Sequence, residues 1–144
     1  MQLTRYSDYS LRSLTYLALN RHRLVTVPEI ASAYGISRAH LMKVIQHLGQ
    51  LGYVETQRGR GGGLGLGMDP SAIRIGDLVL RTEERFQLAE CFPPGTRSCT
   101  IQAACRLRDV LQEALDAFIA ALNRYTLQDL LKNRRGLVQL LRRP

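Results

Sequence analysis

The sequence lacks any apolar run long enough to cross a membrane, which excludes a membrane-spanning helix. It also lacks the apolar core of a signal peptide, because Asp8 and Arg12 interrupt the N-terminal region where that core would lie. At 144 residues, the chain suits one domain, or one small domain with an appended element. We therefore expect a cytoplasmic protein with no membrane partner.

Motifs for nucleotide chemistry and for catalysis are absent as well. The glycines at residues 59–63 do not lead into the Gly-Lys-Ser/Thr of a phosphate-binding loop, and they do not form a βα turn with the acidic residue of a Rossmann fingerprint placed about twenty residues after it. The three histidines, His22, His40 and His47, have no nucleophile paired with them in the sequence. These absences predict a protein that is not an enzyme.

Cysteine is scarce, and the three cysteines all lie between Cys91 and Cys105 in a C-x7-C-x5-C pattern. An odd number argues against a closed disulfide framework, and there is no CxxC pair of the kind that structural zinc sites use. Wide, unequal gaps favour a ligand larger than one zinc ion, an iron-sulfur cluster, which is normally held by four thiolates. Three cysteines would leave one iron with either another ligand or an open position. The alternative is three buried cysteines that act as small hydrophobic side chains.

The net charge of +8 is distributed unevenly along the chain. Residues 1–67 carry eight basic and three acidic side chains, residues 68–131 carry seven and nine, and residues 132–144 carry five basic side chains and no acidic one. The basic N-terminal half is a candidate surface for a polyanion, although such a surface can equally serve solubility alone. The basic tail could equally be a solvated, disordered end.

Helical periodicity first appears between Ser7 and about Asn20. Ser7 is the predicted N-cap, Asp8 lies in the first turn, and Arg12 follows four residues later on the same face. A capping-turn acid with a local ion pair is one interpretation of Asp8 and Arg12. The predicted buried stripe consists of Leu11, Leu14, Leu17 and Ala18.

A helix-turn-helix follows. The segment 26–29 (Thr-Val-Pro-Glu) has capping-box spacing and begins a helix that Gly35 ends, and Ser37 is the predicted N-cap of the next helix. The buried face of that helix is predicted at Leu41, Val44, Ile45, Leu48 and Leu51. In this motif the second helix enters the major groove of DNA, although an ordinary helical hairpin is the alternative. Its predicted exposed residues are Arg38, Ala39, His40, Met42 and Lys43.

A β-hairpin is predicted next, with strands at residues 53–58 and 64–66 around a turn at residues 59–63. A hairpin in this position is a wing. Arg58 and Arg60 flank glycines, including Gly61 and Gly62, that let the backbone approach a phosphate or a minor groove. A plain flexible hairpin is the alternative.

The remaining helices complete the predicted architecture, which is mainly α with a small β wing. A helix at residues 75–82 closes a winged helix-turn-helix domain (residues 1–82), and a cysteine loop covers residues 83–105. Apolar residues three or four apart between Ile101 and Arg124 predict a long amphipathic helix that pairs with a second copy, or else folds back on its own domain. That helix and a short one capped by Thr126 make up residues 101–131, and a basic tail makes up residues 132–144.

Several motifs together resemble one family over nearly the whole chain. They are Ser7-Asp-Tyr-Ser-Leu-Arg12, Gly35-Ile-Ser-Arg-Ala-His-Leu41, Arg58-Gly-Arg-Gly-Gly-Gly63, Ala72-Ile-Arg-Ile-Gly-Asp77, Ala104-Cys-Arg-Leu107 and Tyr125-Thr-Leu-Gln-Asp-Leu130. With the cysteine loop, they resemble the winged-helix iron-sulfur repressors, the family that contains IscR, and above all its nitric-oxide-sensing branch.

This resemblance implies a homodimer with crossed long helices and one iron-sulfur cluster per subunit, a [4Fe-4S] cluster with [2Fe-2S] as the alternative. The implied cluster ligands are Cys91, Cys99, Cys105 and Asp8 of the partner subunit. Arg12 would hold that carboxylate. The residues expected at palindromic double-stranded DNA are Ser37, Arg38, His40, Lys43, Arg58, Arg60, Gly61 and Gly62.

Three departures from the family pattern accompany the resemblance. Seven residues separate Cys91 from Cys99, which is wider than the family's usual four or five. Arg108 stands where IscR-like members have a histidine ligand, which counts against that ligation. Ala39 and Met42 replace polar residues of IscR, so the DNA target should differ.

The predicted function is a dimeric repressor that binds an inverted-repeat operator of nitric-oxide-detoxification genes. It would release the operator when nitric oxide nitrosylates the cluster. Three alternatives stay open: a sensor of iron or of iron-sulfur cluster supply, a thiol/disulfide redox-sensing regulator, and an iron-sulfur carrier whose basic half binds no particular sequence.

Overall fold

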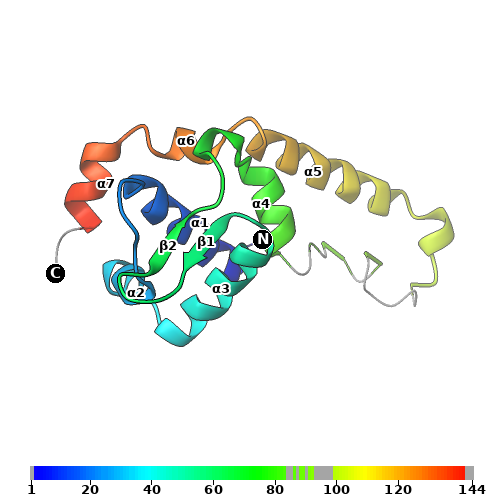
Figure 1. Ribbon diagram of the computed structural model, residues 1–144. Helices are drawn as coiled ribbons and strands as arrows, with labels where there is room; N and C mark the ends of the chain where they lie inside the picture. The colour runs from blue at the N-terminus through cyan, green and yellow to red at the C-terminus, as the bar shows by residue number, and fades with distance from the viewer. Residues whose placement is uncertain (1, 84–85, 87, 90, 93–98, 142–144) are drawn as a thin grey trace.

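The computed structural model describes residues 2–83, 86, 88–89, 91–92 and 99–141. Its elements in chain order are α1 (Arg5–Leu19), α2 (Val27–Tyr34), α3 (Arg38–Gln50), β1 (Val54–Gln57), β2 (Gly63–Leu66), η1 (Pro70–Ala72), α4 (Ile75–Thr82), η2 (Gln102–Ala104), α5 (Arg106–Leu122), α6 (Leu127–Leu130) and α7 (Arg134–Leu141). The predicted fold class, mainly helical with a small antiparallel hairpin, is confirmed (Figure 1).

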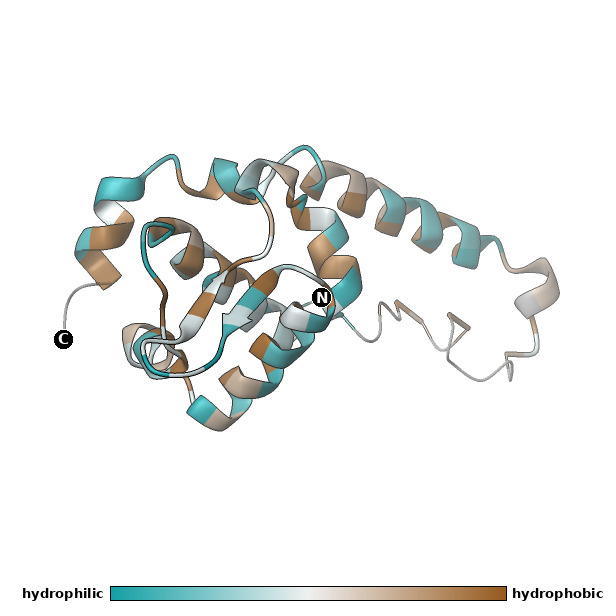
Figure 2. Ribbon diagram, in the orientation of Figure 1, coloured by the Kyte–Doolittle hydropathy of each residue, from teal (hydrophilic) through white to brown (hydrophobic). Residues whose placement is uncertain are grey.

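The core lies where α1, α2, α3 and the hairpin meet. Leu14, Ile30, Leu41 and Leu48 are fully buried there, because the apolar stripe of each helix turns inward. The predicted stripes of α1 and α3 are confirmed, although Leu11 and Leu51 are only half-buried. Figure 2 shows the corresponding hydrophobic bands on the inner sides of the helices.

The N-terminus of α1 differs from the prediction. Thr4 is the N-cap, and its side chain accepts a hydrogen bond from the backbone N–H of Ser7. Ser7 itself is fully buried inside the helix, and its hydroxyl meets that of Thr82 at 2.8 Å. The prediction of Ser7 as the cap is therefore wrong, because a distant partner on α4 takes up its side chain.

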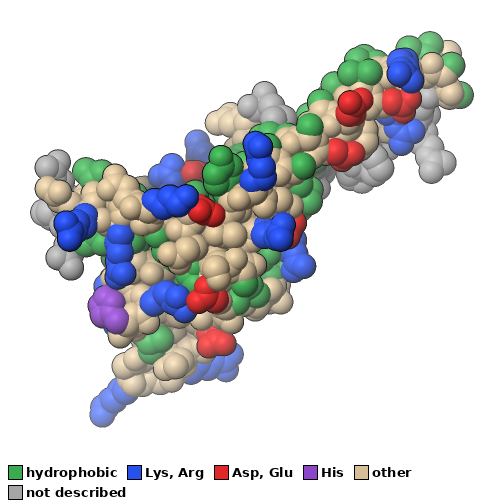
Figure 3. Space-filling model, turned by 90° about the horizontal axis from the view of Figure 1, so that it is seen from above, with side chains coloured by type: hydrophobic (Ala, Val, Ile, Leu, Met, Phe, Trp, Pro, Cys, Tyr) green, Lys and Arg blue, Asp and Glu red, His purple; other side chains and the backbone are tan. Residues whose placement is uncertain are grey.

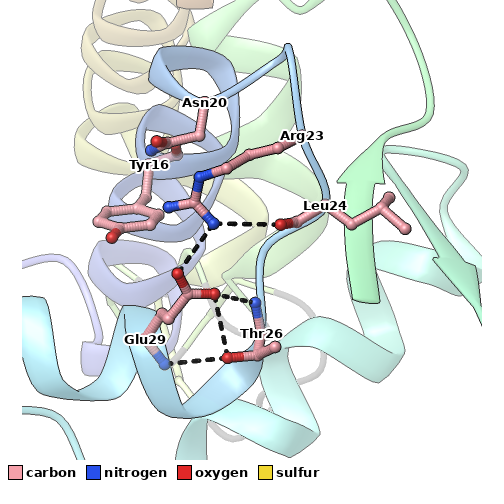
Figure 4. Close-up of polar contacts among 6 residues, drawn as sticks. All are labelled: Tyr16, Asn20, Arg23, Leu24, Thr26 and Glu29. Carbon is pink, nitrogen blue, oxygen red and sulfur yellow. Dashed lines mark hydrogen bonds and ion pairs between the residues drawn. The ribbon is translucent and has the colours of Figure 1, made fainter. Parts of the chain in front are cut away.

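The capping box that starts α2 is confirmed (Figure 4). Thr26 donates its backbone N–H to Glu29 Oε2 at 2.6 Å, and Glu29 N–H donates to Thr26 Oγ1 at 3.4 Å. Arg23 Nη1 donates to Glu29 Oε1 at 2.8 Å and to the Leu24 carbonyl at 3.1 Å. Burial raises the pKa of Glu29, but the hydrogen bonds from Thr26 and Arg23 outweigh it and leave this pKa below its usual 4.5.

The hairpin pairs Val54 with Leu66 and Gln57 with Gly63. Val25, just before α2, adds a further antiparallel bridge to Leu64 through hydrogen bonds of 3.0 and 2.7 Å. This bridge joins the wing to the start of the helix-turn-helix, so the two parts have a fixed mutual orientation.

The C-terminal elements form a second layer. α4 is confirmed at its predicted bounds, and α5 packs on it only near the α5 C-terminus before extending away from the rest of the molecule (Figure 1). The long helix begins at Arg106 and ends at Leu122, so the predicted bounds of 101 and 124 are wrong by a few residues. Residues 102–104 form a 3-10 turn before Cys105, and Asn123 follows as the C-cap. Thr126 begins α6 as predicted, with its N–H donating to Asp129 Oδ2 at 2.9 Å.

The basic tail contains a helix that the sequence analysis did not predict. α7 covers Arg134–Leu141 and lies at the end of the molecule opposite the projecting end of α5 (Figure 1). Arg134 Nη2 donates to the Leu19 carbonyl at the end of α1, at 3.1 Å. The alternative of a disordered end is therefore wrong for residues 134–141.

Candidate nucleic-acid interface and candidate metal centre

The turn between α2 and α3 holds the two helices in a helix-turn-helix. Gly35 ends α2 in the left-handed conformation at φ 64°, which glycine adopts without the steric cost of a side chain. Ile36 then inserts into the core, and its N–H donates to the Ala31 carbonyl at 2.9 Å. These contacts fix how α3 is presented at the surface.

The outer face of α3 is basic and polar. The five side chains predicted to be exposed, Arg38, Ala39, His40, Met42 and Lys43, are all exposed. No acidic residue occurs among the thirteen residues of α3, so nothing on this helix repels a phosphate backbone. Gln46 and Gln50 are also exposed there, and the sequence analysis missed them although their spacing from Ala39 and Met42 marks the same face.

Ser37 occupies the predicted N-cap position of α3, but its hydroxyl makes no capping hydrogen bond. The hydroxyl is exposed and is therefore available to an external acceptor. His40 and Lys43 lie nearer to α1 and line a hollow of about 300 Å³ with Tyr6 and Tyr9. Tyr6 also donates its hydroxyl to the Lys43 carbonyl at 3.3 Å, which fixes α1 against α3.

The wing presents its basic residues at the turn between β1 and β2. Arg58 and Arg60 are both exposed, and Gly59 and Gly61 adopt positive φ values of 99° and 75°. Gly62 N–H donates to the Gly59 carbonyl at 3.0 Å and closes the turn. The two arginines therefore extend from a tight glycine turn that can approach a nucleic-acid backbone closely.

The three cysteines are free thiols. Cys91 and Cys105 are half-buried and Cys99 is exposed, while residues 93–98 between them lie outside the described residues. Cys105 is the N-cap of α5, at the end of that helix farthest from the winged domain (Figure 1). Among the described residues of one chain, no three Cys, His, Asp or Glu side chains form a group that could hold a metal ion. Convergence of the cysteines on one cluster stays a prediction.

Asp8 lies on the surface of α1, with its side chain 41% exposed. Arg12 Nε donates to Asp8 Oδ1 at 2.9 Å, as the i,i+4 spacing predicted. The Arg12 guanidinium also lies 5.8 Å from the centroid of the Tyr34 ring, a contact that the sequence analysis missed. Burial raises the pKa of Tyr34 to about 12, so the ring under Arg12 stays neutral. The carboxylate is thus oriented yet accessible to a second subunit.

The donor set fits an iron-sulfur cluster. Three thiols that are free of disulfides provide the soft ligands that cluster iron takes, and an accessible carboxylate on another element can complete four-fold ligation. The nearest acid that follows the cysteines is Asp109, in the first turn of α5.

The dimer prediction rests on α5. Leu107 and Val110 of α5 are 62% and 51% exposed, and Ile101, which precedes the helix, is 65% exposed, whereas Leu115 is the one buried residue of α5. Figure 3 shows hydrophobic side chains along the projecting arm beside acidic ones. In the part of the chain that the structure describes, this apolar surface is left without a covering element, as expected for a helix that pairs with a second copy.

A helix-turn-helix followed by a two-stranded wing, with a basic recognition helix, defines the class of winged-helix DNA-binding transcriptional regulators. The chain belongs to the Rrf2 family, whose profile is described as an iron-dependent transcriptional regulator and matches residues 3–133.

Relatives and solved structures agree with this assignment. The chain is 53% identical over 143 residues to the HTH-type transcriptional regulator NsrR of Bacillus subtilis, covering 99% of this chain and 98% of that one. It is 47% identical over 143 residues to NsrR of Geobacillus kaustophilus, covering 99% and 97%. Its fold is similar to that of T. potens IscR, with a TM-score of 0.74, 23% identity and coverage of 92% and 88%. It is also similar to B. subtilis CymR, described as the global cysteine regulator, with a TM-score of 0.62, 26% identity and coverage of 90% and 95%.

The assignment to a family of transcriptional regulators agrees with the prediction of a protein that is not an enzyme. A membrane-crossing helix is not found either, since none among the described residues combines the required length and apolar character.

Proposed function

We propose that this chain is a dimeric repressor that senses nitric oxide through a [4Fe-4S] cluster. Each cluster would be held by Cys91, Cys99 and Cys105 and by Asp8 of the partner subunit. The observation that carries the proposal is the set of three free thiols between the winged domain and α5, in a chain 53% identical to a regulator named NsrR. When bound, the cluster supplies the iron that reacts with nitric oxide.

The chain's own residues divide the work of DNA binding. Arg38 and His40 would contact base edges, with Ser37 beside them at the start of α3. Lys43, Arg58 and Arg60 would bind phosphates, and Gly61 and Gly62 allow the close approach of the wing. The exposed apolar residues of α5 support dimerisation, which would present two copies of α3 to the two halves of an inverted repeat.

Asp8 has a double role in this proposal. An oxygen ligand on iron is exchanged more easily than a thiolate, so the Asp8 position is where a small molecule would enter. Arg12, held over the Tyr34 ring, would hold the Asp8 carboxylate in place whenever it is not bound to a cluster. After such an exchange, Asp8 of one subunit would no longer be bound to the cluster of the other. The relative position of the two recognition helices (α3) would then change, and operator binding would weaken.

The first experiment is anaerobic isolation followed by absorption and Mössbauer spectroscopy, which report cluster type and ligand asymmetry together. Asp8→Ala is expected to assemble a cluster on three cysteines with altered spectra and altered reactivity toward nitric oxide. Asp109→Ala, which removes the acidic residue nearest to Cys105 in the sequence, is the matched control and should behave as wild type. If Asp8→Ala has wild-type spectra and reactivity, Asp8 is not a cluster ligand and serves only in the ion pair with Arg12.

A second candidate is sensing of iron or of cluster supply, which the family description as iron-dependent favours. Release of a palindromic promoter fragment should be compared for nitric oxide, oxygen and an iron chelator on the same reconstituted protein. Selective release by nitric oxide supports the first proposal, and release by the chelator alone supports the second. Release by oxidants from cluster-free protein would instead indicate thiol/disulfide sensing by the cysteines.

A further inference from the structure

Two apolar side chains lie on the face of α3 that the proposed function directs toward DNA. Met42 is 62% exposed, and it is the large hydrophobic side chain that α3 leaves at the surface. Ala39 is also exposed, three residues earlier. The core takes Leu41, Val44, Ile45 and Leu48 from the opposite side of the same helix. Met42 therefore contributes little to the core, and its side chain is available for contacts at this surface.

Helix geometry places these residues in one row. At 3.6 residues per turn, Ala39, Met42 and Gln46 project within a narrow sector that points away from the buried face. Basic side chains lie to either side of the row, with Arg38 before Met42 and Lys43 after it. When Arg38 and Lys43 contact phosphates or the outer base edges, Met42 in the middle of the row lies against the base pairs themselves.

The chemistry of the row selects among base pairs. In the major groove, an A·T pair presents the C5-methyl group of thymine, whereas a G·C pair has only a hydrogen atom at the corresponding C5 position of cytosine, beside polar groups. Ala39 has no hydrogen-bonding group and the thioether of Met42 is only a weak acceptor, so neither side chain can replace the water removed from a polar base edge, and packing them against G·C would carry a desolvation cost. Against a thymine methyl group, the same contact buries apolar surface on both sides. Gln46, in the same row, has the amide that pairs with adenine.

We infer that Met42 and Ala39 contact thymine methyl groups and make the regulator specific for A·T pairs at the centre of each half-site. This inference rests on the proposed function, because it requires α3 to enter the major groove. Beyond that function, the inference identifies Met42 and Ala39 as the apolar residues that select bases. They differ from the charged residues, which supply affinity.

The test begins with operator sequences selected from a random duplex library by the wild-type protein. Each dT of a selected half-site is then replaced by dU, which removes only the methyl group, and the change is made symmetrically in both half-sites. Burial of one methyl group corresponds to about a fourfold change in affinity, so loss of a contact in both half-sites should weaken binding by roughly tenfold to twentyfold. We expect this loss of affinity when dU replaces dT at one or two positions of the half-site.

The double-mutant cycle assigns the contact. In Met42→Ala, the dU penalty at one of these positions should shrink to about twofold or less, because the methyl partner is already gone. Leu80→Ala removes a 47% exposed apolar side chain from α4 and is the control, with the wild-type dU penalty retained. Replacing the sensitive T·A by C·G should weaken binding, and 5-methylcytosine at that position should restore part of the loss. Far-ultraviolet circular dichroism should be the same for all three proteins.

The outcomes are distinct. Enrichment of A·T positions with a dU penalty that depends on Met42 supports the inference. Equal binding of dT and dU operators, or an unchanged penalty in Met42→Ala, overturns methyl recognition by Met42 and leaves DNA binding intact. Failure to enrich any sequence overturns the proposed sequence-specific DNA binding, and the inference with it.

Discussion

Gly76 determines how closely α5 approaches the winged domain. It is buried in the first turn of α4, and a Cβ there would lie 2.5 Å from Asn123 Oδ1 and 2.7 Å from the Ile119 carbonyl oxygen. Asn123 in turn accepts from Asp77 N–H at 2.9 Å and donates to Asp77 Oδ1 at 2.8 Å. The missing side chain at Gly76 is therefore what lets this pair of hydrogen bonds form.

Gly76→Ala should destabilise the protein. Real Cβ atoms do not approach other atoms this closely, and the Ile119 carbonyl belongs to a helix backbone that cannot turn aside. Overpacking of this kind costs about 1–3 kcal/mol, which exceeds the gain of roughly 0.5–1 kcal/mol from replacing glycine by alanine in a helix. We expect a net loss of about 1–2 kcal/mol, or about 2–8 °C in Tm for a chain of this size.

Urea denaturation at a fixed protein concentration measures this loss. Gly49→Ala is the matched control, because Gly49 lies in α3 and the nearest atom to a new Cβ is 3.7 Å away, at ordinary contact distance. Gly49→Ala should therefore be neutral or slightly stabilising. Asn123→Ala combined with Gly76→Ala should cost less than the sum of the single changes, since one of the two clashes disappears. If Gly76→Ala is as stable as Gly49→Ala, the close packing of α4 on α5 described above is wrong.

Three further predictions concern other parts of the chain. The backbone N–H of Thr126, followed by Lys132, lowers the pKa of Asp129 from 3.8 to about 2. The ionised carboxylate therefore stabilises the fold above pH 3.8, and this contribution is lost as the pH falls toward 2; Asp129→Asn should remove it, as carbon-13 NMR titration and acid unfolding can check. Arg60→Ala should reduce the slope of log affinity against log salt by about 0.9 per lost phosphate contact, whereas Arg124→Ala, outside the winged domain, should leave the slope unchanged. Thr82→Val should cost about 1–3 kcal/mol because it leaves the buried Ser7 hydroxyl without its partner at 2.8 Å, and adding Ser7→Ala should recover part of that cost in urea denaturation.

Local sequence signals were sufficient for the helix-turn-helix. Thr26 and Glu29 cap their own helix, and Gly35 ends it, so each of these roles depends on neighbours within a few residues. The periodic apolar residues of α3 identified its buried face for the same reason. Where the determinants are local, the sequence alone predicts the structure.

Contacts between residues far apart in the sequence could not be predicted from such local signals. Ser7 looked like a cap because it precedes an apolar stripe, but its partner is Thr82, far along the chain. In the tail, five basic side chains among residues 132–144 obscured the helical α7, whose Arg134 contacts the end of α1. The proposed metal centre has the same difficulty, because the spacing of the cysteines does not determine where Asp8 of a second subunit would lie.

The contacts at the end of α4 have a mechanical consequence. Thr4 donates its backbone N–H and its hydroxyl to Glu83 Oε1 at 2.7 and 3.1 Å, one residue beyond the Ser7–Thr82 hydroxyl pair. The residue from which the cysteine-bearing stretch departs is thus tethered to the front of the helix that carries Tyr6. A displacement of Glu83 must therefore either break these hydrogen bonds or move α1, and with it the Tyr6 hydroxyl that donates to the backbone of α3.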